Sequence, residues 1–358
     1  MTTVDTWELL TRKDDLAVRE VRPALPGPLA DGQVLLTVEK FSMTMNTITY
    51  TRMGASELPF WEAFPSPDGY GRTPVWGFVR VERSLHPDIA AGERYYGWVT
   101  AATHHVVTPE RTSRGFVDTA RHISFMPTWY RTFQRVAEPD DLDDRRVVFR
   151  QIFPASFNLA DFLVGHAEDG AKSVLVTSAS SKTAIGLAEE LAARRARLPV
   201  NAITSARNVG FVRGLGCYDT VTSYSDLTSA SVHAPAVFVD FTGEHRKMAA
   251  VYARFPGELT HTALVGYTHP LFEQQPPPLT SPEPEIFFTP IVEEEIAAEE
   301  GEERFYARYH AAEDRFLVST ARWLTVHRHS GPDAIVEGFN ALLNGPQSPD
   351  ETHVFSPR

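Results

Sequence analysis

The segment VLVTSASSKTAIGLAEELA, residues 174–192, runs from a short apolar stretch directly into a helical pattern of apolar residues. The same change from strand to helix recurs further along the chain. The patterns predict strands over 173–177, 200–204, 219–223, 236–241 and 262–267, and helices near 183–195 and 206–214. Short apolar strands separated by helices are typical of a parallel sheet covered on both faces. This part of the chain is therefore predicted to be a doubly wound α/β domain.

A different pattern precedes this region. Short β-rich runs alternate with turn residues at 33–43, 75–84, 93–100 and 104–109. They predict a compact, mostly β unit at the start of the chain. Beyond the α/β region, the proline-rich segment 273–284 is interpreted as a linker, and 293–324 as a long helical stretch whose acidic residues face solvent.

Length and charge narrow the function classes. The chain has 358 residues, which favours about two domains, and a formal net charge of −12. Nucleic-acid binders present a basic face, so DNA and RNA are not expected partners. The single cysteine, Cys217, cannot form an internal disulfide or a multi-cysteine zinc site. No secretory signal and no apolar run of about 20 residues is visible, which favours a cytoplasmic protein with no membrane partner.

The turn between the first strand and its helix is a candidate phosphate-binding loop. Backbone N–H groups at a helix start have no internal partners, and the helix dipole adds positive charge there. Of the usual glycines only Gly186 is present, and we expect it to let helix and strand pack closely. Hydroxyl and ammonium groups stand in for the others: Ser178, Ser180, Ser181, Lys182 and Thr183. An ordinary serine-capped turn is the competing interpretation.

A P-loop is disfavoured. That motif needs glycine immediately before the lysine and five positions earlier, where this chain has Ser181 and Val176.

The end of the second strand indicates which dinucleotide would bind. NAD-binding proteins place an Asp or Glu there to accept the ribose 2′-hydroxyl. This chain has Ser205 and Arg207 instead, and a guanidinium suits a 2′-phosphate, which a carboxylate would repel. NADP(H) is the predicted cofactor. The alternative is that both are ordinary surface residues.

These residues resemble a known family. The segments SVLVTSASSKTAIGLAEELA, AITSARNVGFVRGLGCYDTVTSY and VFVDFTG…TALVGY are similar to the nucleotide domain of the medium-chain dehydrogenase/reductase superfamily, in its zinc-free quinone-reductase and enoyl-reductase branch. Upstream, FSMTMNTITYTRMG and TPVWGFVRV resemble the branch's first domain. The resemblance is nearest to an uncharacterised domain family with SSASSKTAIG, TSARN and PVWGF signatures.

The resemblance implies a fold and an activity. It implies a GroES-like β-rich domain over 1–145 and 280–358, whose C-terminal tail returns to it, and a Rossmann domain over 146–279. It also implies NADPH-dependent hydride transfer to an enone, enoyl thioester or ketone, without an established substrate, and a possible homodimer. No metal is expected, because one thiol and scattered histidines cannot reproduce the catalytic zinc ligands of other members.

Three residues are candidates for the proton chemistry that accompanies hydride transfer. Tyr50 lies one helical turn after Asn46, so both could face one cleft. In the enoyl reductases that the chain resembles, a tyrosine downstream of this Asn takes part in protonation; Asn46 would orient a group rather than titrate. Tyr130 is the reserve acid. Burial as core aromatics is the alternative for both tyrosines.

Further cofactor contacts are expected where parallel strands end, because ligands of open parallel sheets lie outside those ends. The candidates are Tyr224, Phe241, Thr242, Gly266 and Tyr267.

Three other interpretations of the whole chain compete with a reductase: a non-catalytic binding protein, a nucleotide hydrolase and a zinc alcohol dehydrogenase. The crowded aromatics of the first domain favour an apolar or aromatic small-molecule substrate. A non-catalytic NADPH-binding sensor or scaffold would keep Ser205 and Arg207 but needs no acid. A nucleotide hydrolase and a zinc alcohol dehydrogenase are disfavoured by the missing glycines and metal ligands.

Overall fold

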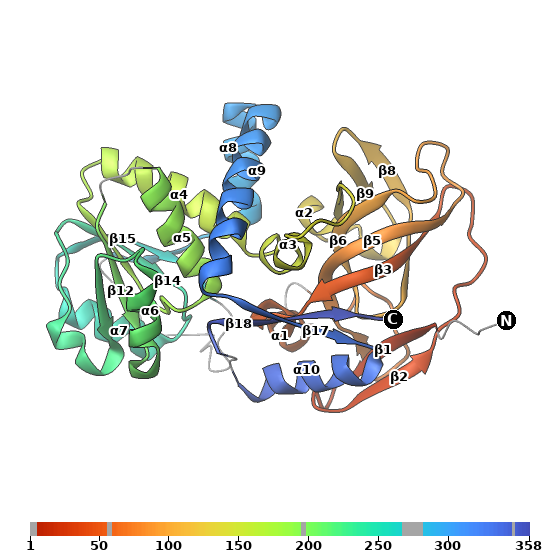
Figure 1. Cartoon of the computed structure of the whole chain (residues 1–358), viewed down its shortest axis with the longest axis horizontal. Coiled ribbons are helices and arrows are strands. Elements are labelled where there is room, and N and C mark those ends of the chain that lie inside the picture. The colour runs from red at the N-terminus through yellow and green to blue at the C-terminus, as the bar shows by residue number, and fades with distance from the viewer. Residues whose placement is uncertain (1–5, 56–58, 195–197, 267–281, 346–347) are drawn as a thin grey trace. The chain divides into compact units, whose positions relative to one another are not determined.

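The computed structural model describes residues 6–55, 59–194, 198–266, 282–345 and 348–358. It forms two compact units, which are considered separately (Figure 1). The first unit combines Met1–Val148 with Thr325–Arg358, and the second is Phe149–Leu324.

The first unit is mostly β-structure, as predicted, and its strands pair antiparallel except for β17 with β18. A three-stranded sheet has the order β2-β1-β4, and a nine-stranded sheet has the order β17-β18-β3-β5-β6-β10-β9-β8, with β7 also paired to β3. The strands are β1 (Trp7–Arg12), β2 (Arg19–Pro23), β3 (Val34–Ser42), β4 (Tyr70–Arg72), β5 (Pro74–Ser84), β6 (Arg94–Thr100), β7 (His104–Val107), β8 (Pro109–Thr112), β9 (Gly115–Asp118), β10 (Thr132–Arg135), β17 (Thr325–Ser330) and β18 (Glu351–Ser356). The helices are α1 (Met45–Arg52), η1 (Arg121–Ile123), α2 (Thr128–Arg131), α3 (Asp143–Phe149) and α10 (Pro332–Asn344).

The end of the chain returns to this first unit. Strand β18 pairs antiparallel with β3, where Phe355 lies opposite Phe41, and it pairs parallel with β17. Helix α10 contributes Ile335 and Phe339 to the same apolar core as Phe41. These long-range pairings make the C-terminal segment part of the first unit's core.

The second unit is a six-stranded, all-parallel sheet in the order β13-β12-β11-β14-β15-β16. Its strands are β11 (Ser173–Val176), β12 (Val200–Thr204), β13 (Thr220–Ser223), β14 (Ala236–Asp240), β15 (Leu259–Leu264) and β16 (Pro284–Ile286). Its helices are α4 (Phe153–Glu168), α5 (Lys182–Ala193), η2 (Ala206–Asn208), α6 (Val209–Leu215), η3 (Tyr224–Ser229), α7 (His245–Arg254), α8 (Thr289–Glu300), α9 (Glu302–Ser319) and η4 (Thr320–Arg322). The order reverses beside β11, which makes this a doubly wound sheet with a switch point between β11 and β14.

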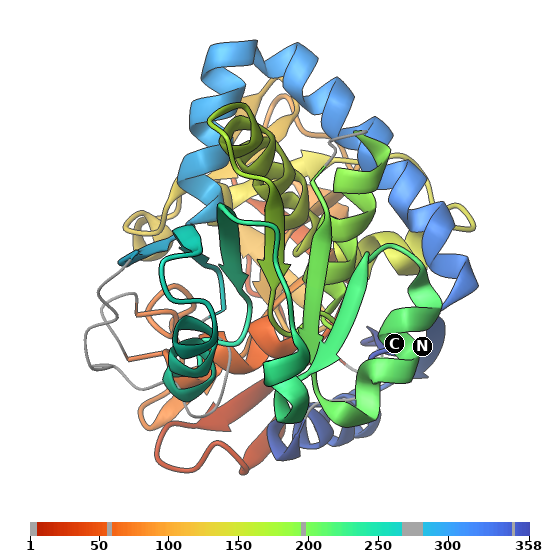
Figure 2. The same cartoon turned by 90° about the vertical axis from the view of Figure 1, so that its left-hand side faces the viewer.

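Helices cover both faces of this sheet, as predicted (Figure 2). On one face, Val174 and Val176 of β11 pack with Leu187 of α5. On the other, Leu175 packs with Val251 of α7. Successive side chains of one strand thus point into two cores, which explains why the strand is apolar throughout.

The domain assignment of residues 280–324 needs correction. The prediction placed them with the β-rich domain, but α8 and α9 pack on α4 in the second unit, and α9 also contacts α5. Part of the predicted linker, 273–281, lies outside the described residues, and Pro284 begins β16, at the edge of the parallel sheet.

The predicted long helix over 293–324 is two helices. Gly301, with φ of 90°, separates α8 from α9. Its acidic residues are not all solvated, because Glu293 and Glu313 are buried. Glu293 accepts a hydrogen bond from Tyr306, and Glu313 pairs with Arg150 at 2.6 Å.

No single helix among the described residues is long and apolar enough to cross a membrane, and only α3 and α4 taken together, across a sharp bend, reach that length and composition. The apolar residues of α4 are largely buried in the second unit's own core.

Candidate functional site

The candidate site lies at the carboxyl ends of the parallel strands in the second unit. Strand β11 is fully buried, and its exit turn leads into α5, whose N-cap is Ser181. The Ser181 hydroxyl accepts a hydrogen bond from the backbone N–H of Ala184. This predicted phosphate-loop residue therefore closes the first turn of the helix, as a capping serine does.

Ser178 takes the backbone role of a missing glycine. Its φ is 50°, in the left-handed region that glycine adopts most readily, and it is the only non-glycine with positive φ among the described residues. Its N–H donates to the hydroxyl of Tyr224 at 2.8 Å. The hydroxyl of Tyr224, which follows the strand two places away in the sheet, thus occupies one N–H group of this turn.

Tyr224 opens η3 immediately after β13. Burial raises the pKa of its hydroxyl above the ordinary value, so it stays protonated while it accepts from Ser178. The ammonium of Lys247, on α7, lies 4.7 Å from the centre of its ring and pairs with Glu244 at 2.6 Å. Lys247 was not among the predicted residues.

Ser180 connects the turn to the end of β12. Its hydroxyl accepts hydrogen bonds from Asn208 at 2.8 Å and Thr204 at 3.3 Å. The N–H of Ala179 also donates to Ile203 O at 3.1 Å. These bonds bring the residues that follow β12 beside the phosphate-loop turn, as the dinucleotide prediction requires.

The two predicted 2′-phosphate residues follow β12 directly. Ser205 Oγ is buried and has no hydrogen-bond partner in the described part of the chain. The side chain of Arg207 is exposed and forms no ion pair with any residue described here. A buried hydroxyl is nearly always hydrogen-bonded, so Ser205 points to a partner that the chain alone does not supply.

Lys182 and Thr183 begin α5, and both are half-buried. The Thr183 carbonyl accepts a hydrogen bond from Ser156 on α4. The Thr183 hydroxyl forms no hydrogen bond with any described residue.

Gly186 packs against a helix rather than a strand. A Cβ at this position would lie 2.7 Å from Ser156 Oγ and 3.4 Å from Phe153, both on α4. The expected close approach of α5 to the sheet is therefore corrected to a close approach of α5 to α4.

A buried carboxylate that the prediction missed organises the end of β14. Asp240 Oδ1 accepts from Thr177 Oγ1 at 2.5 Å and from Thr242 Oγ1 at 2.8 Å, and Oδ2 accepts from the N–H of Gly243 at 2.8 Å. Burial raises the pKa of Asp240, and these hydrogen bonds oppose the rise. A single Asp closing an apolar strand is the signal that could have identified it.

Thr242 and Phe241 are held by this network, and Gly266 packs directly on them. A Cβ at Gly266 would lie 2.2 Å from the carbonyl carbon of Phe241. The N–H of Gly266 donates to Asp240 O at 3.0 Å. Strand β15 ends at Leu264, so Gly266 follows the strand, and Tyr267 lies outside the described residues.

The candidate acids lie in the first unit. Tyr50, on α1, is 6% exposed, and Tyr130, on α2, is 7% exposed. Trp76 Nε1 donates to the Tyr50 hydroxyl at 3.3 Å, and burial raises the pKa of Tyr50 to about 12, opposed by hydrogen bonds with Trp76 and Tyr130. The Asn46 side chain is half-buried, and its backbone N–H donates to Thr44.

The tyrosines are part of a large aromatic cluster. Tyr50 and Tyr130 are 6.2 Å apart between ring centres, and each contacts Phe60 and Trp98. Among the described residues, no three His, Cys, Asp or Glu side chains gather in a way that could hold a metal ion.

Comparison with solved structures gives matches along nearly the whole chain. CurA from Vibrio vulnificus, in complex with NADPH, is 12% identical, covers 98% of this chain and 99% of its own, and has a TM-score of 0.66. TarJ from S. aureus, in complex with NADPH, is 9% identical with a TM-score of 0.61 and 98% coverage of both chains. The mitochondrial 2-enoyl thioester reductase Etr1p/Etr2p heterodimer from Candida tropicalis is 10% identical, covers 99% and 100%, and has a TM-score of 0.58.

These likenesses confirm the predicted two-domain fold of the medium-chain dehydrogenase/reductase superfamily. A search of curated proteins finds no match. The family model described as "Protein of unknown function (DUF2855)" matches residues 41–347, which is most of the chain. The chain belongs to this family, and it shares the fold of CurA, TarJ and the enoyl thioester reductase.

Proposed function

We propose that this protein is an NADP(H)-dependent, zinc-independent oxidoreductase that transfers hydride to an enone, an enoyl thioester or a ketone. The observation that carries the proposal is the pair Ser205 and Arg207. A buried hydroxyl and an exposed guanidinium, neither with a partner among the described residues, follow β12 beside the loop turn of a doubly wound sheet. A 2′-phosphate would give both groups an acceptor.

The residues present fit the coenzyme. Ser178, Ser180 and the first turn of α5 would face its diphosphate, with Arg207 and Ser205 at the 2′-phosphate and Thr242 and Gly266 toward the nicotinamide end. When bound, the coenzyme supplies a hydride. Two solved neighbours of this fold, CurA and TarJ, are complexes with NADPH, and a third is an enoyl thioester reductase, which supports the same assignment.

The proton would come from Tyr50, and Tyr130 is the reserve acid. Trp76 Nε1 donates to the Tyr50 oxygen, so the Tyr50 proton is not directed to Trp76. A phenol whose pKa is about 12 stays protonated at neutral pH and can donate a hydrogen bond to a substrate oxygen. Asn46 would orient that oxygen or a water. The surrounding aromatics favour an apolar or aromatic substrate.

A second function is favoured by one observation. Both phenols are more than nine-tenths buried and bonded within the aromatic cluster. A non-catalytic NADPH-binding sensor needs only the second-unit site and would keep these tyrosines as core.

The test is NADPH oxidation, followed by absorbance, across a panel of enones, enoyl thioesters and ketones. Turnover of any of these by the wild-type protein, lost when Arg207 is changed to Ala at limiting NADPH, supports the reductase. NADPH binding without turnover on the whole panel would favour the sensor.

A further inference from the structure

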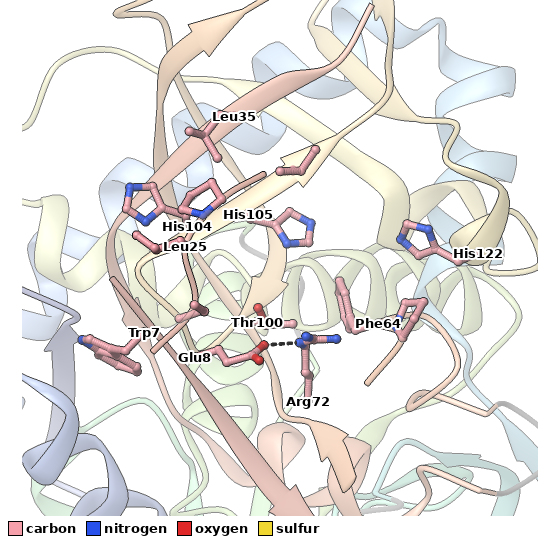
Figure 3. A pocket seen from close by; sticks show the side chains of 15 residues that line it. Trp7, Glu8, Leu25, Leu35, Phe64, Arg72, Thr100, His104, His105 and His122 are labelled. Carbon is pink, nitrogen blue, oxygen red and sulfur yellow. Dashed lines mark hydrogen bonds and ion pairs between the residues drawn. The ribbon is translucent and has the colours of Figure 1, made fainter. Parts of the chain in front are cut away.

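The first unit contains a pocket of about 280 Å³ that none of the candidate site residues lines. It lies between β1, β4 and β7, with Leu25 and Pro26 at one side and Phe64 at another. The volume is near the lower end of small-molecule sites. Figure 3 shows the side chains that turn into it.

Three nitrogen-bearing side chains, His105, His122 and Arg72, line this pocket. His105 and His122 turn their rings toward one another, with Arg72 and Phe64 beside them (Figure 3). Neither histidine ring hydrogen-bonds to a described residue. The His105 ring lies 5.5 Å from the ring of Phe64, edge to face.

Only one of the three guanidinium nitrogens of Arg72 is hydrogen-bonded to a described residue. Its Nε donates to Glu8 at 2.6 Å, and no described residue accepts a hydrogen bond from its two terminal nitrogens. The side chain is 25% exposed, within the pocket lining. A guanidinium with two free terminal N–H₂ groups is shaped to bind a carboxylate.

The charges that face the pocket are those of Glu8, Arg72, His104, His105 and His122. Glu8 and Arg72 balance each other. His104 is bound to Glu82 and Thr103. A neutral imidazole still carries one N–H group, so the His105 ring can donate a hydrogen bond into the pocket.

We infer that this pocket binds a small organic carboxylate, with its anionic group on Arg72, His105 and His122 and its apolar body against Phe64, Leu25 and Pro26. Leu25 is 85% exposed and lines the pocket, so it gives the ligand an apolar rim.

Proton uptake follows from this arrangement. Burial, together with the charges of His122 and Arg72, lowers the pKa of His105 to about 3, so His105 is neutral at ordinary pH. A bound carboxylate raises that pKa, and binding must therefore tighten as the pH falls.

The experiment is calorimetric titration of the full chain with benzoate at pH 5.5 and 7.5, with benzamide as the uncharged probe. We expect benzoate to bind at least about tenfold more tightly than benzamide and more tightly at the lower pH. Arg72→Gln should weaken benzoate about tenfold. Arg121→Gln is the matched control, because it removes a neighbouring exposed cation that does not line the pocket.

If Arg72→Gln fails to fold because Glu8 loses its partner, His122→Gln, at an exposed position, replaces it and should weaken benzoate at pH 5.5. NADPH binding should be unchanged in every variant, so this result is separable from the proposed function. Equal binding of benzoate and benzamide, no binding of either, or equal losses in Arg121→Gln and the pocket variants would overturn the inference. If inorganic phosphate bound and benzoate did not, the assignment of an organic carboxylate as the ligand would be wrong.

Discussion

The strand ends of the second unit and the aromatic cluster of the first differ in how accessible their unbonded polar groups are. At the strand ends, Ser178, Ser180 and Asp240 are hydrogen-bonded, whereas no described residue bonds the Ser205 hydroxyl or the exposed guanidinium of Arg207. In the aromatic cluster, Trp76 donates to the Tyr50 hydroxyl, and Trp98 Nε1, which has no described partner, is fully buried among the rings. The exposed cation at the strand ends is free to meet a ligand, whereas the aromatic cluster is closed as a core. Coenzyme binding therefore has stronger structural support than catalysis.

The largest expected effect comes from a substitution that disrupts the packing of the strand ends in the second unit. In Gly266→Val the new Cβ would lie only 2.2 Å from the carbonyl carbon of Phe241, which is a severe clash. The clashing atom belongs to the backbone, so it cannot move aside as a flexible side chain could. We expect a loss of about 3 kcal/mol or more in the free energy of unfolding, measured by denaturant titration. Gly210→Ala, in α6 with no atom within 4 Å, should change it by less than about 1 kcal/mol. Similar small changes in both variants would contradict the packing described.

Tyr50→Phe tests whether the aromatic cluster is more than a core. If Tyr50 supplies the proton, turnover should fall about 100-fold while the Kd for NADPH stays within about twofold. Both quantities are measured on the same preparation, and Tyr95→Phe, a buried tyrosine bonded to Glu93 in the same unit, is the control. Unchanged turnover in Tyr50→Phe removes the residue from the chemistry.

Arg207→Ala sharpens the claim for the strand ends. Loss of a charge-assisted contact to the 2′-phosphate should weaken NADPH by about 10- to 100-fold and leave NADH nearly unchanged. The exposed Arg213, on α6, offers a control substitution that removes the same charge elsewhere on the unit. Equal losses for the two coenzymes would refute the 2′-phosphate role.

Asp240→Asn gives a smaller effect with a defined pH dependence. The Asn side chain places an N–H₂ group where the Thr177 hydroxyl or the Gly243 N–H now donates to a carboxylate oxygen. We expect the free energy of unfolding at acidic pH to fall by about 1–3 kcal/mol. Because burial raises the folded-state pKa of Asp240, folding favours its protonated form. The wild-type protein should then lose stability as the pH rises from the unfolded-state pKa through the raised value, and Asp240→Asn should flatten that slope. Parallel slopes in the two proteins would mean that Asp240 does not titrate there.

The sequence was most informative where local pattern determines structure. Strand β12 lies at the predicted residues 200–204, because an apolar run between helices has few alternatives. The positive φ of Ser178 could not be predicted, since it depends on the hydrogen bond from its N–H to Tyr224, a residue distant in sequence.

Contacts between distant segments account for the other differences. Gly186 meets α4 because Ser156 and Phe153 lie on that helix, which no local pattern indicates. Glu313 forms a buried ion pair with Arg150, a residue far away in sequence that lies just before α4. The segment around Glu313, predicted to face solvent, therefore contains a buried carboxylate. The bond between Tyr50 and Tyr130 likewise joins segments that only tertiary folding brings together.

The most direct test of the central claim is calorimetric titration of the wild-type protein with NADPH and, separately, with NADH. The account predicts saturable binding of NADPH that is at least about tenfold tighter than that of NADH, because only NADPH carries the phosphate that Ser205 and Arg207 lack. No binding of NADPH, or equal affinity for the two coenzymes, would contradict it.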